Sequence, residues 1–200
     1  MGPTASGKTE VAIELCRHFP MDVISVDSAL VYRGMDIGTA KPDEATLRTT
    51  PHRLIDIREP EESYSAGDFV RDAQEAMQAI FESGRTPLLV GGTMMYFRSL
   101  TAGMAELPPA DVAVRAALDA EAAERGWPAL HEELRQVDPA AAGRINPNDS
   151  QRIQRALEVY RLSGRALSAW QESTSVSEEI SFRKLALQVE PRSLLHERIA

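Results

Sequence analysis

The first hundred residues alternate between short apolar runs and longer mixed stretches, a pattern typical of an α/β protein. Apolar, β-rich runs at 22–27, 53–57 and 86–90 predict three buried strands. Mixed apolar and polar stretches at 8–19 and 65–83 predict helices between them. Strands that alternate with helices predict a parallel sheet covered by helices on both faces, which makes a three-layer core.

The pattern changes after the first hundred residues. Residues 103–170 contain no convincing strand, and their apolar spacing predicts helices at 110–125, 127–137 and about 148–163. Each of these helices ends at a glycine or at an Asp-Pro pair, which are ordinary stop signals. We interpret this stretch as an inserted helical subdomain.

The last thirty residues begin with a polar stretch, 171–181, that predicts a linker. A strand pattern resumes at 182–189, which predicts a return to the sheet. The expected organisation is an α/β core over 1–102, a helical insertion over 103–170, and a linker with a return to the core over 171–200.

Composition narrows the class of protein. Hydrophobic residues make up 43% and charged residues 26% of the chain, which is ordinary for a protein that buries a core. The single cysteine, Cys16, cannot form an internal disulfide, and the four histidines lack metal-ligand spacing. Because no apolar run approaches the ~18 residues of a membrane span, and no signal peptide begins the chain, we expect a cytoplasmic protein without a membrane partner.

The formal net charge of −8 argues mildly against a nucleic-acid partner, because phosphate contacts need Lys and Arg. An average hides patches, however. Residues 144–165 hold five arginines against two acids, a net charge of +3. From charge alone, this stretch is equally consistent with an RNA-binding surface and with an ordinary solvated helix face.

The strongest motif stands at the start of the chain. Gly2–Thr9 reads Gly-Pro-Thr-Ala-Ser-Gly-Lys-Thr, a complete phosphate-binding loop. Its glycines let the backbone turn N–H groups toward an anion, Lys8 reaches the terminal phosphates, and Thr9 offers a hydroxyl to Mg²⁺. A helix that opens near Lys8 adds its positive end. The loop predicts a P-loop NTPase-like core and, taken alone, a nucleotide-binding enzyme such as an ATP user.

Two strand ends carry the other candidate chemistry. Asp27 ends the first predicted strand, where ligands of open α/β sheets bind. It could accept a proton, hold a metal-bound water, or only cap the turn that begins with Ser28. Gly91-Gly92-Thr93 follows the third predicted strand without the acid that hydrolysing P-loop enzymes place there. This disfavours a motor or switch NTPase and leaves Thr93 either near the ligand or in a tight turn.

Both ends of the chain predict a fragment of a longer protein. A phosphate-binding loop normally follows a buried strand, and only Met1 precedes Gly2. At the other end, residues 193–200 read as a helix that stops without a C-cap. We expect the missing first strand to weaken the sheet and the loop that it supports.

Several segments together resemble the bacterial tRNA dimethylallyltransferase (IPP transferase) family. In order and spacing these are residues 2–9, 24–30, 32–42, 51–56, 88–93 and 147–159. The resemblance covers nearly the whole chain, with Met95 standing where the family often has Leu. It implies transfer of a five-carbon dimethylallyl group to N6 of the tRNA adenosine next to the anticodon. The family continues past residue 200 with a further catalytic arginine and further tRNA-binding residues.

The resemblance also implies roles for individual residues. The loop would hold the leaving diphosphate of dimethylallyl diphosphate through Gly2, Pro3, Thr4, Ala5, Ser6, Gly7, Lys8 and Thr9. Thr4 would reach the oxygen that bridges carbon and phosphorus, and Asp27 would accept the proton of the adenine amine. The implied cofactor is Mg²⁺, held by Thr9.

By the same resemblance, the anticodon stem-loop of tRNA is the macromolecular partner of a monomeric enzyme. The implied contacts are Asp27, Ser28, Ala29, Leu30, Thr93, Arg115, Gln151, Arg152, Ile153, Gln154 and Arg155. In a helix that starts near Asn148, Gln151 and Arg155 share a face. This favours the RNA-binding interpretation of the basic stretch.

Three alternatives remain open. A P-loop small-molecule kinase would transfer the γ-phosphate of ATP, although the acid-free turn after the third strand speaks against it. A related transferase would prenylate free AMP, although the helical insertion favours tRNA. A truncated transferase would be a non-catalytic module that binds tRNA and diphosphate.

Overall fold

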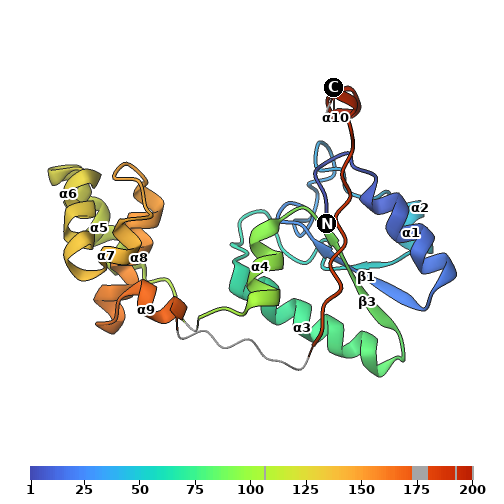
Figure 1. Cartoon of the computed structure of the whole chain (residues 1–200), viewed down its shortest axis with the longest axis horizontal. Coiled ribbons are helices and arrows are strands. Elements are labelled where there is room, and N and C mark those ends of the chain that lie inside the picture. The colour runs from blue at the N-terminus through green and yellow to red at the C-terminus, as the bar shows by residue number, and fades with distance from the viewer. Residues whose placement is uncertain (106, 173–179, 192, 200) are drawn as a thin grey trace. The chain divides into compact units, whose positions relative to one another are not determined.

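The computed structural model describes residues 1–105, 107–172, 180–191 and 193–199. The chain divides into two compact units, Met1–Ala102 with Ser177–Ala200, and Gly103–Val176 (Figure 1). The first unit holds the sheet, and the second contains helices α5 to α9. Most of the predicted linker at 171–181 lies outside the described residues.

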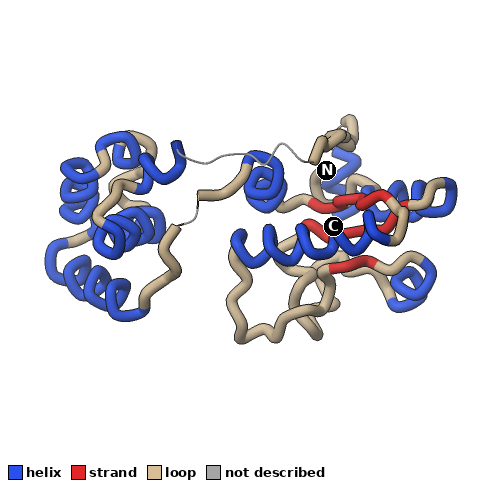
Figure 2. The backbone as a smooth tube through the Cα atoms, turned by 90° about the horizontal axis from the view of Figure 1, so that it is seen from below, coloured by secondary structure: helices blue, strands red, loops and turns tan. Residues whose placement is uncertain are grey.

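Among the described residues, the sheet has three parallel strands in the order β2-β1-β3. Figure 2 shows the strands in red. They are β1 (Met21–Val26), β2 (His52–Arg53) and β3 (Thr86–Gly91). The central strand β1 pairs with β3 over its whole length and ends with Val26 opposite Gly91. The last four residues of β1 are buried, as expected for a parallel strand covered on both faces. The predicted α/β fold with a parallel sheet is therefore confirmed.

Helices α3 (Ala66–Glu82) and α4 (Met94–Ala102) cover one face of the sheet. The Phe69 ring stacks on Tyr96 with 4.4 Å between the ring centroids, which ties the two helices together. Apolar residues of α3 recur at helical spacing, so one stripe of the helix enters the core. The core on this face consists of Ile24, Val26, Val31, Tyr64, Phe69, Ala73, Ala76, Met77, Ile80, Tyr96, Phe97 and Leu100.

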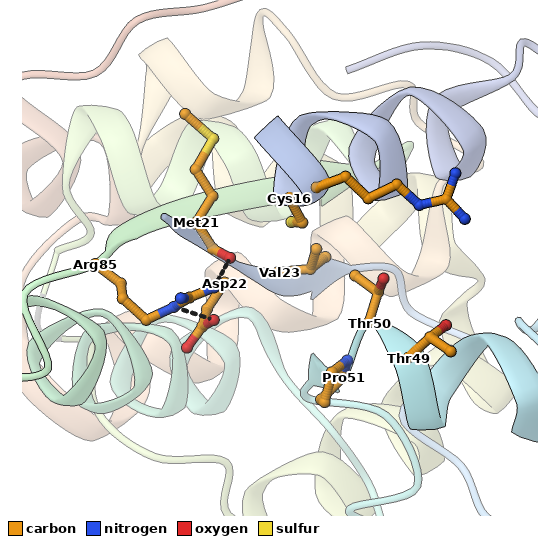
Figure 3. A pocket seen from close by; sticks show the side chains of 9 residues that line it. Cys16, Met21, Asp22, Val23, Thr49, Thr50, Pro51 and Arg85 are labelled. Carbon is orange, nitrogen blue, oxygen red and sulfur yellow. Dashed lines mark hydrogen bonds and ion pairs between the residues drawn. The ribbon is translucent and has the colours of Figure 1, made fainter. Parts of the chain in front are cut away.

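Helix α1 (Lys8–His18) packs on the opposite face. Strand side chains alternate between faces, so Val23 of β1 points away from the α3 side. Figure 3 shows Cys16 of α1 beside Val23. The short helix α2 (Glu44–Thr49), capped by Asp43, was not predicted. It buries no side chain, so its sequence carries no apolar stripe from which a helix could be read.

The second predicted strand, 53–57, is wrong in extent, because β2 ends at Arg53. Leu54 and Asp56 have φ angles of 63° and 55°, which lie in the left-handed region and break an extended chain. The segment instead donates backbone hydrogen bonds from Asp56 and Ile57 to the carbonyls of Leu30 and Val31. Apolar spacing here reflects packing against the core by an irregular chain.

The predicted strand at 182–189 is also wrong, because residues 180–189 form no strand. The segment does run alongside the N-terminal residue: the Met1 nitrogen donates to the Leu185 carbonyl at 2.8 Å, and the Leu187 nitrogen donates to the Met1 carbonyl at 2.8 Å. Ile180 and Phe182 pack against the core. These two hydrogen bonds join the segment to one residue only, which is less than the ladder that defines a strand. After it, α10 (Ser193–Ile199) forms as expected.

In the second unit, the three predicted helices are confirmed as α5 (Val112–Arg125), α6 (Trp127–Val137) and α8 (Ser150–Ser163). Two further helices, α7 (Pro139–Ala142) and α9 (Leu167–Glu172), were not predicted. The unit has its own apolar core, formed by Leu118, Ala122, Leu130, Leu134, Ala142, Ile153, Ala156 and Leu157.

The Asp138-Pro139 pair explains why α7 escaped prediction. The pair predicts the end of α6, which is confirmed, but it also begins the next helix. Asp138 accepts a hydrogen bond from the Ala141 nitrogen, and Pro139 occupies the first helical position. Asp138 also accepts hydrogen bonds from the backbone nitrogen and hydroxyl of Ser168, which fixes the start of α9. Among the described residues, no helix is long and apolar enough to cross a membrane.

Candidate phosphate-binding site and basic helical surface

The loop of Gly2–Thr9 contains two residues with a left-handed backbone. Ala5 and Gly7 have φ angles of 61° and 82°, and α1 begins directly afterwards at Lys8. Among the residues that the structure describes, no side chain caps the first turn of α1. The free N–H groups and the positive end of the helix are therefore available to an anion.

The two glycines of the motif serve different purposes. Gly7 is needed for its left-handed backbone, whereas Gly2 is needed for space. A Cβ atom on Gly2 would lie 2.7 Å from the Ser6 hydroxyl and 2.9 Å from the Leu187 carbonyl oxygen. The Ser6 hydroxyl is itself buried, and within the described part of the chain it has no hydrogen-bond partner. A buried hydroxyl without a partner is costly, so the loop is suited to a polar ligand.

Lys8 folds over this loop. Its Nζ donates a 2.6 Å hydrogen bond to the Pro3 carbonyl. Burial lowers the pKa of Lys8, and the nearby carboxylates of Asp27 and Glu10 oppose part of that shift. A phosphate group would replace the carbonyl as the partner of the ammonium and would favour its charged form.

Asp27 holds the turn that follows β1. Its Oδ1 accepts hydrogen bonds from the backbone nitrogens of Ala29 at 2.9 Å and Leu30 at 3.4 Å. This is the capping role considered above, and it uses one carboxylate oxygen. Oδ2 accepts no hydrogen bond from any residue that the structure describes. One oxygen of Asp27 therefore remains available to a substrate while the other maintains the turn.

The turn after β3 completes this edge of the sheet. Thr93 Oγ1 accepts a 3.1 Å hydrogen bond from the Ser28 nitrogen, so the turns after β1 and β3 are joined. A Cβ atom on Gly92 would lie 3.3 Å from the Gly2 carbonyl oxygen, which places this turn against the loop. The structure thus brings Gly2–Thr9, the turn that starts at Asp27, and Thr93 together at the carboxyl ends of the strands.

The remaining predicted contacts lie in the helical unit. Arg115 of α5 and Arg155 of α8 both bind one carboxylate, that of Glu158. Gln154 donates a 2.7 Å hydrogen bond to Asp119, and Arg152 pairs with Asp149 at 3.1 Å.

Ile153 requires a correction within the predicted tRNA-binding run. Its side chain is 0% exposed and belongs to the core of the helical unit, so it offers no surface to an RNA. The helical period explains this, because Ile153 shares a stripe with Ala156 and Leu157. Gln151 and Arg152 are exposed, and Gln154 and Arg155 are partly exposed.

Sequence reasoning missed Glu158. A glutamate within a basic helix reads as a solvated residue, yet its side chain is 0% exposed. The only local signal was its spacing of three residues from Arg155, which permits an ion pair on one helix face.

A separate cavity of about 100 Å³ lies at the other end of β1 (Figure 3). Cys16, Met21, Val23 and Thr50 line it, and the Arg85–Asp22 ion pair, with 2.7 Å between Nε and Oδ1, forms one wall. None of the predicted site residues lines it. Within the described ranges, no group of three or more His, Cys, Asp or Glu side chains is placed to hold a metal ion.

Comparison with known proteins places this architecture in a family. Over its whole length, the chain is 59% identical to the tRNA dimethylallyltransferase of Thiobacillus denitrificans and 58% identical to that of Thioalkalivibrio sulfidiphilus. It spans 64% and 63% of the length of these relatives.

Solved structures of transferases also match this chain. A eukaryotic dimethylallyltransferase acting on tRNA matches with a TM-score of 0.84 and 26% identity, over 98% of this chain and 49% of that one. The full-length tRNA isopentenylpyrophosphate transferase of Bacillus halodurans matches with a TM-score of 0.52 and 44% identity, over 82% of this chain and 55% of that one. The family model described as IPP transferase matches residues 30–200. The chain therefore belongs to the IPP transferase family.

Proposed function

We propose that the protein transfers a dimethylallyl group from dimethylallyl diphosphate to N6 of the adenosine next to the anticodon of tRNA, releasing diphosphate. The observation that carries this proposal is the placement of a phosphate-binding loop and a carboxylate with one free oxygen at the same edge of the sheet. The names of the relatives, tRNA dimethylallyltransferases, support the substrate classes.

In the proposed reaction, N6 of adenine forms a bond to the allylic carbon while the bond from that carbon to the diphosphate oxygen breaks. The leaving diphosphate gains negative charge, which the loop N–H groups and Lys8 stabilise. Thr4, exposed at the tip of the loop, would donate to the bridging oxygen. The proton leaves N6 for the free Oδ2 of Asp27.

The absence of an acid in the Gly91-Gly92-Thr93 turn fits transfer better than hydrolysis. A P-loop hydrolase uses an acid near the phosphates to hold Mg²⁺ and its water. Here the corresponding turn offers Thr93, whose hydroxyl already binds the Ser28 nitrogen. With no such acid in this turn, water is poorly activated, and Asp27 serves the adenine amine.

Mg²⁺ suits the donor set as a partner of the diphosphate. Thr9 lies in the first turn of α1 beside Lys8 and would supply a hydroxyl ligand. Mg²⁺ commonly takes its other ligands from substrate phosphates and water, so no cage of carboxylates is required. The ion would neutralise charge on the departing diphosphate.

The proposed tRNA contacts lie on both units, and each set is described by itself. Asp27–Leu30 and Thr93 would meet the target base, which has to leave its stack before N6 can react. An anticodon loop is single-stranded, so this extrusion costs less there than in a duplex. Arg115 and the exposed polar residues of 151–155 would bind the RNA backbone. A cytoplasmic monomer is part of the same proposal, and the free Cys16 is compatible with it.

In the test, the full-length protein is incubated with dimethylallyl diphosphate and an unmodified tRNA transcript. We expect N6-dimethylallyladenosine in the digested RNA, and none from a transcript with guanosine at the target position. Failure to form this product with active-site-titrated protein would contradict the proposal. Product from AMP but not from tRNA would identify the free-nucleotide transferase, and transfer from γ-labelled ATP would identify a kinase. Binding of tRNA and diphosphate without turnover would identify a non-catalytic module.

A further inference from the structure

The carboxylate of Glu158 is a buried junction between α5 and α8. Its Oε1 accepts hydrogen bonds from Arg115 Nε and the Asp111 nitrogen, both at 2.8 Å. Its Oε2 accepts hydrogen bonds from Arg115 Nη2 at 3.1 Å and from Arg155 Nη1 at 2.6 Å. Four donors therefore satisfy one side chain that is 0% exposed.

This arrangement resolves two electrostatic conflicts. A buried carboxylate without partners would be strongly destabilising, and two guanidinium groups at the same place would repel each other. Burial opposes the charged form of Glu158, but the hydrogen bonds from Arg115 and Arg155 lower its pKa. The three side chains together retain a net charge of +1.

The two arginines keep unused donors. Arg115 and Arg155 side chains are 42% and 30% exposed. Arg155 Nη2 also donates to the Pro108 carbonyl at 2.8 Å. Within the described residues, neither Arg115 Nη1 nor Arg155 Nε has a hydrogen-bond partner. Both guanidinium groups are thus fixed in orientation while part of each remains able to bind an anion.

We propose that Glu158 is a positioning residue that holds Arg115 and Arg155 in the orientation that binds the phosphate backbone of tRNA, an inference that rests on the proposed function. An exposed arginine loses side-chain freedom when it binds RNA, and this loss reduces affinity. Glu158 restricts the two arginine side chains already in the free protein, so less side-chain freedom is lost when RNA binds. The inference requires no contact between Glu158 and the RNA.

The same two helices provide a matched control. Arg161 of α8 forms a bidentate pair with Glu121 of α5, with Nη1 to Oε1 at 2.7 Å and Nη2 to Oε2 at 2.8 Å. Arg161 also binds Glu133 at 2.9 Å, so two carboxylates neutralise it. This pair bridges the same helices as Arg115–Glu158 but presents no net positive charge to a phosphate.

The test compares Glu158→Gln with Glu121→Gln in titrations of unmodified tRNA. Charge counting alone predicts that removal of either acid tightens RNA binding. If Glu158 positions the arginines, Glu158→Gln should instead weaken tRNA binding. The expected loss of affinity is about tenfold, the size expected when a charge-assisted contact is lost. We expect Glu121→Gln to bind as well as the parent protein. The KM for dimethylallyl diphosphate and the kcat at saturating tRNA should change by less than about twofold in Glu158→Gln.

A double-mutant cycle links the effect to the arginine. Glu158→Gln should weaken tRNA binding less in an Arg115→Ala background than in the parent protein, because only Arg155 then remains to be positioned. Additive losses, or unchanged or tighter binding by Glu158→Gln, would overturn the inference. Loss of kcat with unchanged tRNA affinity would also overturn it, because that pattern indicates a structural role.

A second pair of variants keeps the inference testable if Glu158→Gln does not fold. Arg115→Lys retains the charge but cannot form the bidentate pair, so it should weaken tRNA binding, whereas Arg161→Lys should not. Equal affinity of Arg115→Lys and the parent protein would refute positioning. Because affinity is measured without dimethylallyl diphosphate, absence of prenylated product would count against the proposed function alone.

Discussion

Asp27 has two separable roles in the structure, and two substitutions distinguish them. Oδ1 holds the turn by accepting hydrogen bonds from Ala29 and Leu30, whereas Oδ2, which accepts none from the described residues, is the proposed acceptor of the substrate proton. Asp27→Asn keeps an oxygen that can accept both backbone hydrogen bonds but removes the base. Asp27→Ala removes both the turn contacts and the base.

The magnitudes differ enough to be resolved. One of the two turn hydrogen bonds is short, at 2.9 Å, and the other is long, at 3.4 Å, so Asp27→Ala should destabilise the fold by about 1–2 kcal/mol. Asp27→Asn should cost roughly 0.5 kcal/mol, since the acceptor remains. Loss of a positioned general base lowers turnover by about 10²–10⁴-fold, so both variants should fall by that factor. A domain with roughly 5–15 kcal/mol of stability stays folded after either change, so unfolding cannot mimic the loss.

Single-turnover prenylation of tRNA measures the chemical step, and urea unfolding measures the free energy of unfolding. Asp22→Asn is the matched control, because Asp22 lies on β1, the strand that precedes Asp27, and binds Arg85 at 2.7 Å in the distant cavity wall. It should lose stability and retain turnover. The reasoning is refuted if Asp27→Asn turns over like the parent protein, because Asp27 would then be only the cap of its turn.

Three further outcomes follow from the same geometry. Gly91→Ala should prevent β1 and β3 from pairing, since a Cβ atom there would overlap the Val26 carbonyl; circular dichroism and urea unfolding should show a loss above about 3 kcal/mol. Phe69→Ala should cost about 3–5 kcal/mol, because it empties a fully buried site and removes the stack on Tyr96, and an unfolding midpoint within experimental error of the parent protein would contradict this. Burial lowers the pKa of Lys8 below its ordinary 10.5, and only the charged form of Lys8 binds phosphate well. The affinity for diphosphate should therefore begin to fall at a lower pH than a free lysine would give. Calorimetric titrations of Lys8→Arg should show no such pH dependence.

The parts of the site that depend on local chemistry could be predicted from the sequence. The loop of Gly2–Thr9 adopts its shape through residues that are adjacent in the chain, so its motif carries its geometry. The joining of Asp27 and Thr93 to one edge follows from topology, because parallel strands place their carboxyl ends together. Neither inference requires knowledge of distant contacts.

The errors arose where distant partners decide the structure. Leu54 belongs to an alternating apolar segment that reads as a strand, yet hydrogen bonds from Asp56 and Ile57 to residues 30–31 make it irregular. Ile153 was grouped with its polar neighbours because the motif was read as a block, although its helical spacing placed it in the core. Glu158 could not be assigned to a buried position from sequence, since only the helix that packs against it supplies the second arginine.

Carboxylates therefore act in opposite ways in the two units. At the edge of the sheet, Oδ2 of Asp27 accepts no hydrogen bond from the described residues, which makes this side chain a candidate base. In the helical unit, every oxygen of Glu158 is occupied, which makes it unsuited to proton transfer and suited to fixing cations in place. The hydrogen-bond state of each acid thus separates a proposed base from a residue that orients other side chains, a distinction that residue type and charge alone do not provide.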